Sequence, residues 1–167
     1  MSWLKAFFAG IVGAALITVM LSIAISAGFH VMDFSMMWGT LVGLPVGWVA
    51  WMVGFAINLL VGGIFALWYA VLFKLFSGAG LLRGLFIGIA HAFITGLIMP
   101  LLPLVHPLMN NGQMASPGPY FSEHGTAGVF FFFALHLVYG ATVGWLYSRL
   151  VPSARHTVES NDLRIAA

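Results

Sequence analysis

Four long stretches without a charged residue constrain this chain more than any other feature of its sequence. They cover residues 6–29, 47–73, 84–105 and 125–147. Each is long enough to cross a bilayer as a helix, which takes about 20 apolar residues. Inside lipid the backbone must satisfy its own hydrogen bonds, so spans of this kind are helical. We therefore predict an all-α fold, a polytopic membrane four-helix bundle forming one transmembrane domain over residues 1–150.

The composition supports a surface that faces lipid. Hydrophobic residues make up 62% of the chain and charged residues 6%, whereas soluble domains carry roughly 25% charged residues. The net charge of +2 is too small for a nucleic-acid partner. Lys5 before an apolar run could mark a signal peptide cleaved near Ala27, but 24 uncharged residues exceed the usual apolar core of about 7–15. We expect a retained helix.

The basic residues predict how the chain is oriented in the membrane. The loops at residues 29–46 and 106–124 contain no Lys or Arg, while all six basic residues lie outside these loops: Lys5, Lys74, Arg83, Arg149, Arg155 and Arg164. Positive charge gathers on the cytoplasmic side. We expect an inner-membrane location, both termini in the cytoplasm, and a polar cytoplasmic tail over residues 151–167.

The two halves of the chain resemble each other. Residues 58–72 and 136–150 share four identities at an offset of 78, of which Gly62/Gly140 and Tyr69/Tyr147 are the most distinctive. The first and third spans pair Thr18 with Thr95 at nearly the same offset. A two-span unit returns the chain to its starting side, so its copies run parallel. We predict a duplicated hairpin with halves at about residues 1–77 and 78–150.

Small residues one helical turn apart predict where the helices cross. Such pairs let two backbones approach closely in lipid. Each span has one: Ala9/Gly13, Gly62/Ala66, Gly84/Gly88 and Gly140/Gly144.

In the first long loop, Asp33 is a predicted N-cap for a short interfacial helix over residues 32–43. Pro100 and Pro103 are expected to kink or end the third helix, and the second long loop to be irregular.

A polar layer is predicted near the middle of the membrane. Counted from the nearest basic residue, Thr18, Asn58, Thr95 and His136 all lie about 18–24 Å deep. They can hydrogen-bond in pairs, His136 to Thr95 and Asn58 to Thr18, or they can line a path for a ligand or proton. His91 lies about 12 Å deep, some 8 Å from the level of His136. This separation disfavours a bis-histidine haem, and no cofactor is expected.

A second group of possible ligands lies on the outer face. It comprises His30, His106, His124, Met32, Asp33 and Met109. Imidazole and thioether suit copper and related metals, so a metal site is one interpretation. The alternative is that the histidines cap loops and the methionines fill gaps in the packing.

The sequence indicates a non-enzymatic protein, because it has no recognisable catalytic motif and no cysteine. The run from Met99 to Met109, the Pro117-Gly-Pro turn and the segment after His136 resemble a group of small four-span bacterial membrane proteins of unknown function. That resemblance implies a fold but no activity.

We expect an accessory or scaffold subunit that contacts the lipid bilayer and other membrane subunits or copies of itself. The alternatives are a small transporter or channel using the polar layer, and a metal-handling protein using the outer His/Met group.

Overall fold

The computed structural model describes residues 1–151, which fold into helices without any strand. The elements are α1 (Trp3–Ser26), α2 (Phe34–Leu41), α3 (Trp48–Leu75), α4 (Leu81–Ile98), the 3-10 helix η1 (Met99–Leu104), α5 (Pro107–Asn110), the 3-10 helix η2 (Pro119–His124) and α6 (Gly125–Leu150). The predicted tail beyond Val151, with Arg155 and Arg164, lies outside the described residues.

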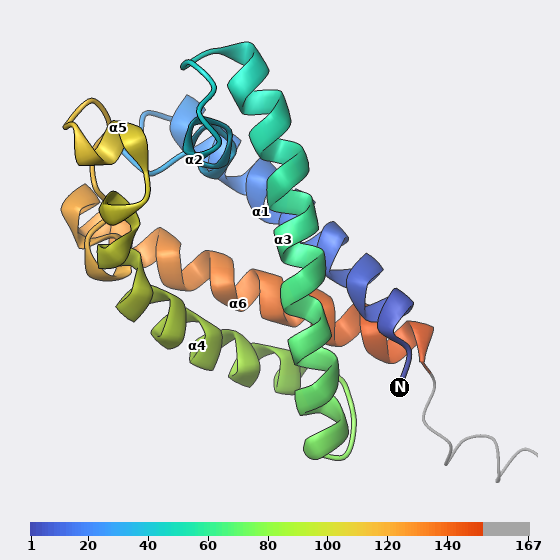
Figure 1. The fold of residues 1–167 in the computed structure, drawn as a ribbon. Helices are drawn as coiled ribbons and strands as arrows, with labels where there is room; N and C mark the ends of the chain where they lie inside the picture. Colours follow the sequence, from blue (N-terminus) through green and yellow to red (C-terminus); the bar gives the residue numbers. More distant parts are fainter. Residues whose placement is uncertain (152–167) are drawn as a thin grey trace, which may run out of the picture.

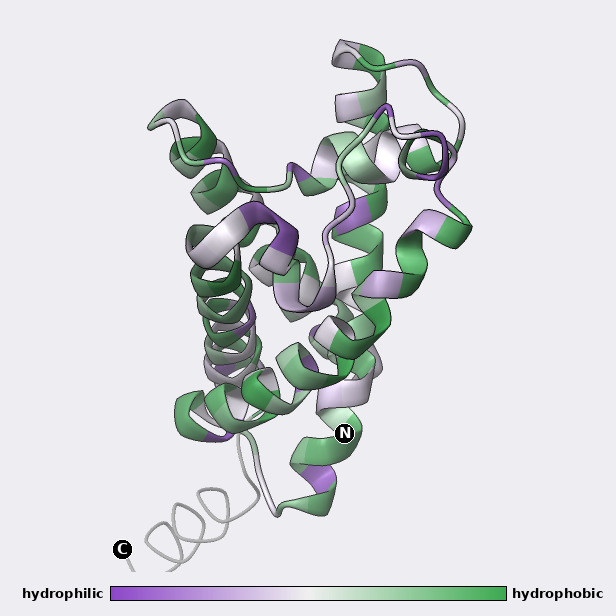
Figure 2. Ribbon diagram, turned by 90° about the vertical axis from the view of Figure 1, so that its left-hand side faces the viewer, coloured by the Kyte–Doolittle hydropathy of each residue, from purple (hydrophilic) through white to green (hydrophobic). Residues whose placement is uncertain are grey.

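Four of the helical segments are long and apolar enough to cross a membrane. They correspond to the four predicted stretches, with α4 continued by η1 in the third and α6 preceded by η2 in the fourth. Figure 2 shows these long helices coloured mostly hydrophobic along their length. The described part of the chain is therefore all-helical, and the prediction of four helices long and apolar enough to cross a membrane is confirmed.

The long helices are arranged in the order α3, α1, α6, α4 (Figure 1). Extensive contacts join α1 to α3, α4 to α6, and α1 to α6, whereas α3 and α4 meet only sparsely. The chain thus makes two helix pairs, and α1 and α6 hold the pairs together.

One end of this arrangement carries the basic residues. The backbone N–H of Ser2 donates to the Tyr147 hydroxyl over 3.1 Å, and Lys5 Nζ donates to the carbonyl of Leu150 over 2.8 Å. These bonds bring the start of α1 to the end of α6. The rings of Phe73 and Tyr147 stack with centroids 5.8 Å apart, which adds the end of α3. We call this the basic end, and the opposite end, with Asp33 and Glu123, the acidic end.

Glycines set the distance between α4 and α6. A Cβ added to Gly84 would fall on the carbonyl oxygen of Gly140, and one added to Gly140 would fall on that of Gly84. A Cβ on Gly88 would lie 2.6 Å from the carbonyl oxygen of His136. Only glycine permits such an approach. The predicted crossings at Gly84/Gly88 and Gly140/Gly144 are confirmed.

The α1–α3 crossing follows the same principle with a different partner residue. A Cβ on Gly10 would collide with the carbonyl oxygen of Gly62. The predicted residue Gly62 is therefore at the crossing, but in α1 the close approach is made by Gly10 instead of Ala9. Gly13 faces α6 instead, where an added Cβ would lie 2.8 Å from the ring of Tyr139.

The short helix α2 begins as predicted, because the Asp33 carboxylate accepts the backbone N–H of Met36 over 3.1 Å. Its packing was not predicted. A Cβ on Gly39 would strike the Ala50 carbonyl, and one on Gly54 would strike the carbonyl of Ser35. This second glycine crossing presses α2 against the first half of α3, so α2 is part of the helical packing and not only an interfacial segment.

The second long loop is more ordered than the sequence indicates. Helix α4 ends at Ile98 and continues as η1, which contains Pro100 and Pro103, so the predicted role of these prolines is confirmed. The expectation of an irregular loop is wrong in part, because α5 and η2 account for about half of residues 106–124. Phe121 holds a left-handed φ of 61° and is 1% exposed. Burial of its ring compensates for the backbone strain that this conformation imposes on a non-glycine residue.

Candidate functional site

The predicted hydrogen bond between the first two spans is confirmed. Asn58 of α3 donates from Nδ2 to Thr18 Oγ1 of α1 over 3.0 Å. Thr18 Oγ1 then donates to the carbonyl of Ala14 over 2.9 Å. Both side chains are buried. The Thr18 hydroxyl thus accepts from α3 and donates within α1, so this pair links the two helices.

The predicted bond between His136 and Thr95 is wrong for the described structure. His136 Nδ1 lies 2.7 Å from the carbonyl oxygen of Phe132, one turn back in its own helix. Thr95 is partly exposed and makes no side-chain hydrogen bond within residues 1–151. The ring of His136 instead contacts His91, with the two centroids 4.9 Å apart and the planes at 85°.

The predicted difference in depth between His91 and His136 is therefore also wrong. Gly84 lies against Gly140 and Gly144, so the neighbouring Arg83 is roughly level with Val143. Arg149 lies six residues further along, or about 9 Å. Arg83 and Arg149 are therefore not level, and depths measured from the two cannot be compared directly. A difference in depth therefore does not disfavour a bis-histidine haem, but two touching rings cannot bind opposite faces of one porphyrin.

His91 and His136, which we call the histidine pair, are enclosed by tyrosines from two other positions. Tyr69 of α3 lies with its hydroxyl 3.2 Å from His91 Nδ1. Tyr139 of α6 donates its hydroxyl to the carbonyl of Gly62 and places its ring 5.9 Å from that of His91. His91 is 6% exposed, and its Nε2 is buried without a hydrogen-bond partner in the described part of the chain.

Neither tyrosine was predicted as a site residue. Tyr69 could have been noticed, because it is one of the identities shared by the two halves. Tyr139 directly precedes Gly140, so its ring lies beside a helix crossing and reaches α1 and α3 from there. A buried tyrosine needs a partner for its hydroxyl, and here that requirement joins three helices.

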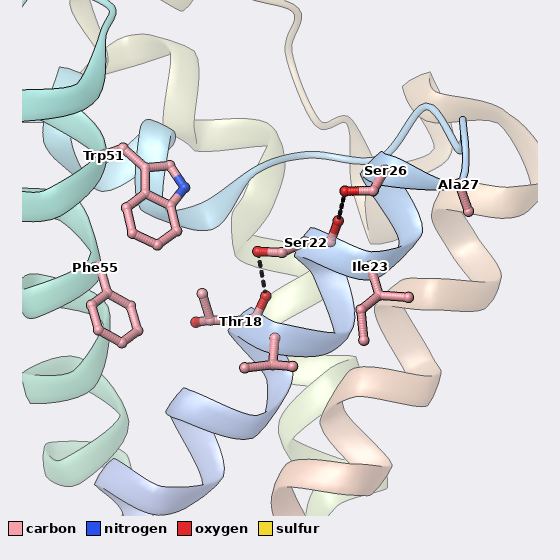
Figure 3. Close-up of a pocket in the computed structure, with 8 residues that line it drawn as sticks. Thr18, Ser22, Ile23, Ser26, Ala27, Trp51 and Phe55 are labelled. Carbon is pink, nitrogen blue, oxygen red and sulfur yellow. Dashed lines mark hydrogen bonds between the residues drawn. The ribbon is translucent and has the colours of Figure 1, made fainter.

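A groove lies between α1 and α3 toward the acidic end (Figure 3). The helices cross at Gly10 and Gly62 and separate beyond that point, which leaves a volume of about 540 Å³. Its walls are formed by Thr18, Val19, Ser22, Ile23, Ser26, Ala27, Trp51 and Phe55. Figure 3 shows Trp51 and Phe55 of α3 on one side and the serines of α1 on the other.

His106, predicted as a metal ligand, is fully engaged in packing. Its Nδ1 accepts the backbone N–H of Met109 over 3.4 Å, which caps α5. Its Nε2 lies 3.1 Å from the carbonyl of Met37 and 3.2 Å from Thr40 Oγ1. A carbonyl only accepts, so Nε2 carries the proton and Nδ1 the lone pair. Both nitrogens are used, and a metal would have to break this link between α2 and α5.

The other predicted ligands of the outer group are also dispersed. Asp33 caps α2 and accepts Trp51 Nε1–H over 3.1 Å. Met32 and Met109 are buried in a hydrophobic cluster, while His30 is exposed. His124 keeps a buried Nε2 without a partner among the described residues. No three His, Asp or Glu side chains in residues 1–151 come together to hold a metal ion.

Comparison with known proteins adds no relative: no family model, no curated protein and no solved structure matches the chain. The resemblance to small four-span membrane proteins therefore stays a prediction. The features of the molecule that bear on its function are the histidine pair, the Asn58–Thr18 link and the groove between α1 and α3.

Proposed function

We propose that this chain is a non-enzymatic, four-span protein of the inner membrane that acts as an accessory or scaffold subunit, binding another membrane protein or a second copy of itself. The observation that carries the proposal is the groove between α1 and α3. The groove lies where two membrane helices of this chain separate and no third helix of residues 1–151 fills the space.

The α1 wall of the groove has the character of a helix-packing surface. Thr18, Ser22 and Ser26 recur every four residues and form a stripe of small side chains, which is typical of contacts between membrane helices. Ser22 donates to the carbonyl of Thr18 over 2.9 Å, and Ser26 to that of Ser22 over 2.8 Å. Because the hydroxyl hydrogens of Ser22 and Ser26 are already donated to carbonyls of α1, these serines present a nearly apolar surface to a partner helix.

A matched pair of substitutions tests this proposal. Ser22→Leu fills the groove, whereas Ala56→Leu adds the same bulk to an exposed position of α3 outside it. After extraction in mild detergent, native mass spectrometry should detect a defined partner or homo-oligomer with the wild type and Ala56→Leu, and not with Ser22→Leu. A wild type that is always a lone monomer contradicts the proposal, as does an assembly that Ser22→Leu leaves intact.

The orientation and the duplicated hairpin belong to the same proposal. One end of the helices carries four basic residues: Lys5, Lys74, Arg83 and Arg149. The positive-inside rule requires this arrangement of a chain whose termini are cytoplasmic. The crossings support duplication, since Gly10 and Gly88, like Gly62 and Gly140, stand 78 residues apart and all four make close backbone contacts.

Two single-cysteine variants, Ser116→Cys and Ser148→Cys, test the orientation, because the chain has no cysteine of its own. Position 116 lies in the second long loop and position 148 near the basic end of α6. In intact cells an impermeant thiol reagent should label the Ser116→Cys variant alone, and both variants should react once the membrane is permeabilised. Labelling of Ser148→Cys in intact cells would reverse the proposed orientation.

Transport is the second candidate function, and one specific observation favours it. The Nε2 of His91, which has no hydrogen-bond partner among residues 1–151, is a buried polar group of the kind that marks an ion or proton pathway. Proteoliposomes holding the wild type should then acidify under an imposed pH gradient faster than those holding His91→Gln. Equal rates in the two preparations would remove this candidate.

The third interpretation, metal handling by the outer His/Met group, loses support because His106 and Asp33 are engaged in packing.

A further inference from the structure

We propose that the basic end of the helices binds the headgroup of an anionic phospholipid through Lys5, Lys74 and Arg149, which we call the cationic cluster. A headgroup with two phosphates, as in cardiolipin, is the preferred ligand. The orientation proposed above decides only which leaflet supplies the lipid. The groove between α1 and α3 plays no part in this binding, so the lipid site and the accessory role can fail separately.

Three helices meet at the side chain of Tyr147, and the fold thereby gathers basic residues that are far apart in the sequence. The start of α1 reaches it because the backbone N–H of Ser2 donates to the Tyr147 hydroxyl over 3.1 Å. The end of α3 reaches it through the ring of Phe73, which stacks on that of Tyr147 with centroids 5.8 Å apart. Lys74 is the residue after Phe73, and Arg149 follows Tyr147 by two residues in α6.

The ammonium group of Lys5 is held at the same place. Its Nζ donates to the carbonyl of Leu150 over 2.8 Å, next to Arg149 in the sequence. An ammonium has three N–H donors, so two remain for phosphate oxygens, and a guanidinium can bind two such oxygens at once. The side chains of Lys5, Lys74 and Arg149 are all exposed, so a headgroup can reach them.

The charge of the cationic cluster is not balanced by the described part of the chain. Asp33 and Glu123 are the only acidic residues among positions 1–151, and both lie at the opposite end. Two long helices, α1 and α4, begin at the basic end and two others, α3 and α6, end there, so the charges of their macrodipoles largely cancel. The three positive charges of the cluster therefore remain, and a headgroup with two phosphates offsets more of them than a headgroup with one.

A simpler explanation accounts for part of the cluster. Lys74 and Arg149 lie in the last turns of α3 and α6, where the helix dipole favours a cation without any ligand. Lys5 differs, because it lies in the first turn of α1, which has no acidic residue and no side-chain cap, and a cation there is disfavoured. Bringing this third charge beside the other two adds repulsion among like charges. A bound anion relieves that repulsion.

Two tryptophans place the cationic cluster at the level of the lipid headgroups. Trp3 of α1 is 50% exposed and Trp145 of α6 is 49% exposed, both toward the basic end. Half-exposed tryptophan side chains are typical of the boundary between lipid and water. At this level each Lys or Arg strengthens the attraction to anionic lipid by about 5-fold.

The experiment measures lipid binding to the full chain after delipidation in a neutral detergent. The protein is titrated with cardiolipin, phosphatidylglycerol or the zwitterionic phosphatidylcholine, and native mass spectrometry counts the lipids that stay bound. We expect cardiolipin to bind more tightly than phosphatidylglycerol, and phosphatidylcholine to bind weakest. Lys74→Gln and Arg149→Gln should each weaken cardiolipin binding by about 5-fold.

Arg83→Gln is the matched control, because it removes the same charge from the same end. Arg83 lies against the loop before α4, where a Cβ added to Gly78 would be 2.7 Å from its Nη1, and it is about 9 Å from the level of Arg149. This variant should bind cardiolipin like the wild type. The proposal is overturned if cardiolipin binds no more tightly than either other lipid, if Lys74→Gln or Arg149→Gln keeps wild-type affinity, or if Arg83→Gln loses as much affinity as they do.

Discussion

Gly140→Ala is the substitution whose effect follows most directly from the packing of α4 on α6. The added Cβ would fall on the Gly84 carbonyl oxygen and 2.9 Å from the Cα of Gly88, whereas ordinary contact begins at 3.4 Å. The contact with the oxygen is the shorter of the two, so the helices must separate by roughly 1 Å, and a gap of that size forfeits a quarter to a half of the dispersion energy between facing atoms. We expect the free energy of unfolding to fall by about 1–3 kcal/mol, the range found for overpacked cores.

Reversible unfolding in mixed micelles by titration with sodium dodecyl sulfate is a suitable assay, with the loss of helix measured by circular dichroism. A change of about 1–2 kcal/mol alters the ratio of folded to unfolded protein by about 5–30-fold, which such a titration resolves. Gly80→Ala is the matched control. It makes the same chemical change next to the same helix pair, but a Cβ at Gly80 would meet nothing within 4 Å.

The reasoning is refuted if Gly140→Ala and Gly80→Ala unfold at the same detergent fraction. Equal stability would mean that α4 and α6 do not approach as closely as their glycines allow. A second comparison checks the origin of the effect: Gly62→Ala, which would place its Cβ 2.5 Å from that of Ala14, should weaken the α1–α3 crossing by a similar amount.

Three further substitutions test the polar contacts of the fold. Asn58→Leu removes the bond to Thr18 and should lower the free energy of unfolding by about 1 kcal/mol; an unchanged detergent titration would contradict the observed link. His106→Leu removes the side-chain contacts to Met37, Thr40 and the backbone N–H of Met109 and should destabilise the acidic end by about 1–3 kcal/mol. Hydrogen exchange should then rise in α2 and α5 and not at the α4–α6 crossing, and a uniform rise would refute a local role. Tyr139→Phe removes the hydroxyl donated to Gly62 and should reduce stability by about 1 kcal/mol, so wild-type stability would show that this bond contributes nothing.

Features that depend on local sequence were predictable. The long uncharged stretches identified the four membrane helices, because lipid imposes both a length and a helical backbone on them. Asp33 marked the start of α2, and Pro100 marked the point where α4 gives way to a 3-10 helix. In each case the cause lies within a few residues of its effect, so no knowledge of distant partners was needed.

Features that depend on which helix faces which were harder to predict. The close packing of α2 on α3 rests on Gly39 and Gly54, which belong to no obvious pair because they lie on separate helices. His91 was placed at the wrong level for a related reason. The basic residue nearest to His91 in its helix is Arg83, the one nearest to His136 is Arg149, and these two arginines are not level. The glycine crossing of α4 and α6 gives the correct register, since it fixes the two backbones against each other directly.

That register also explains why the two halves differ at the histidine pair. Asn58 and His136 stand 78 residues apart, as do Gly13 and His91. In the first half, Gly13 leaves space for the ring of Tyr139, and Asn58 bonds to Thr18. In the second half a histidine stands in the position of Gly13, and His136 contacts it instead of Thr95. A histidine at Gly13 would collide with Tyr139, so if the hairpin is duplicated, only its second copy can form the histidine pair.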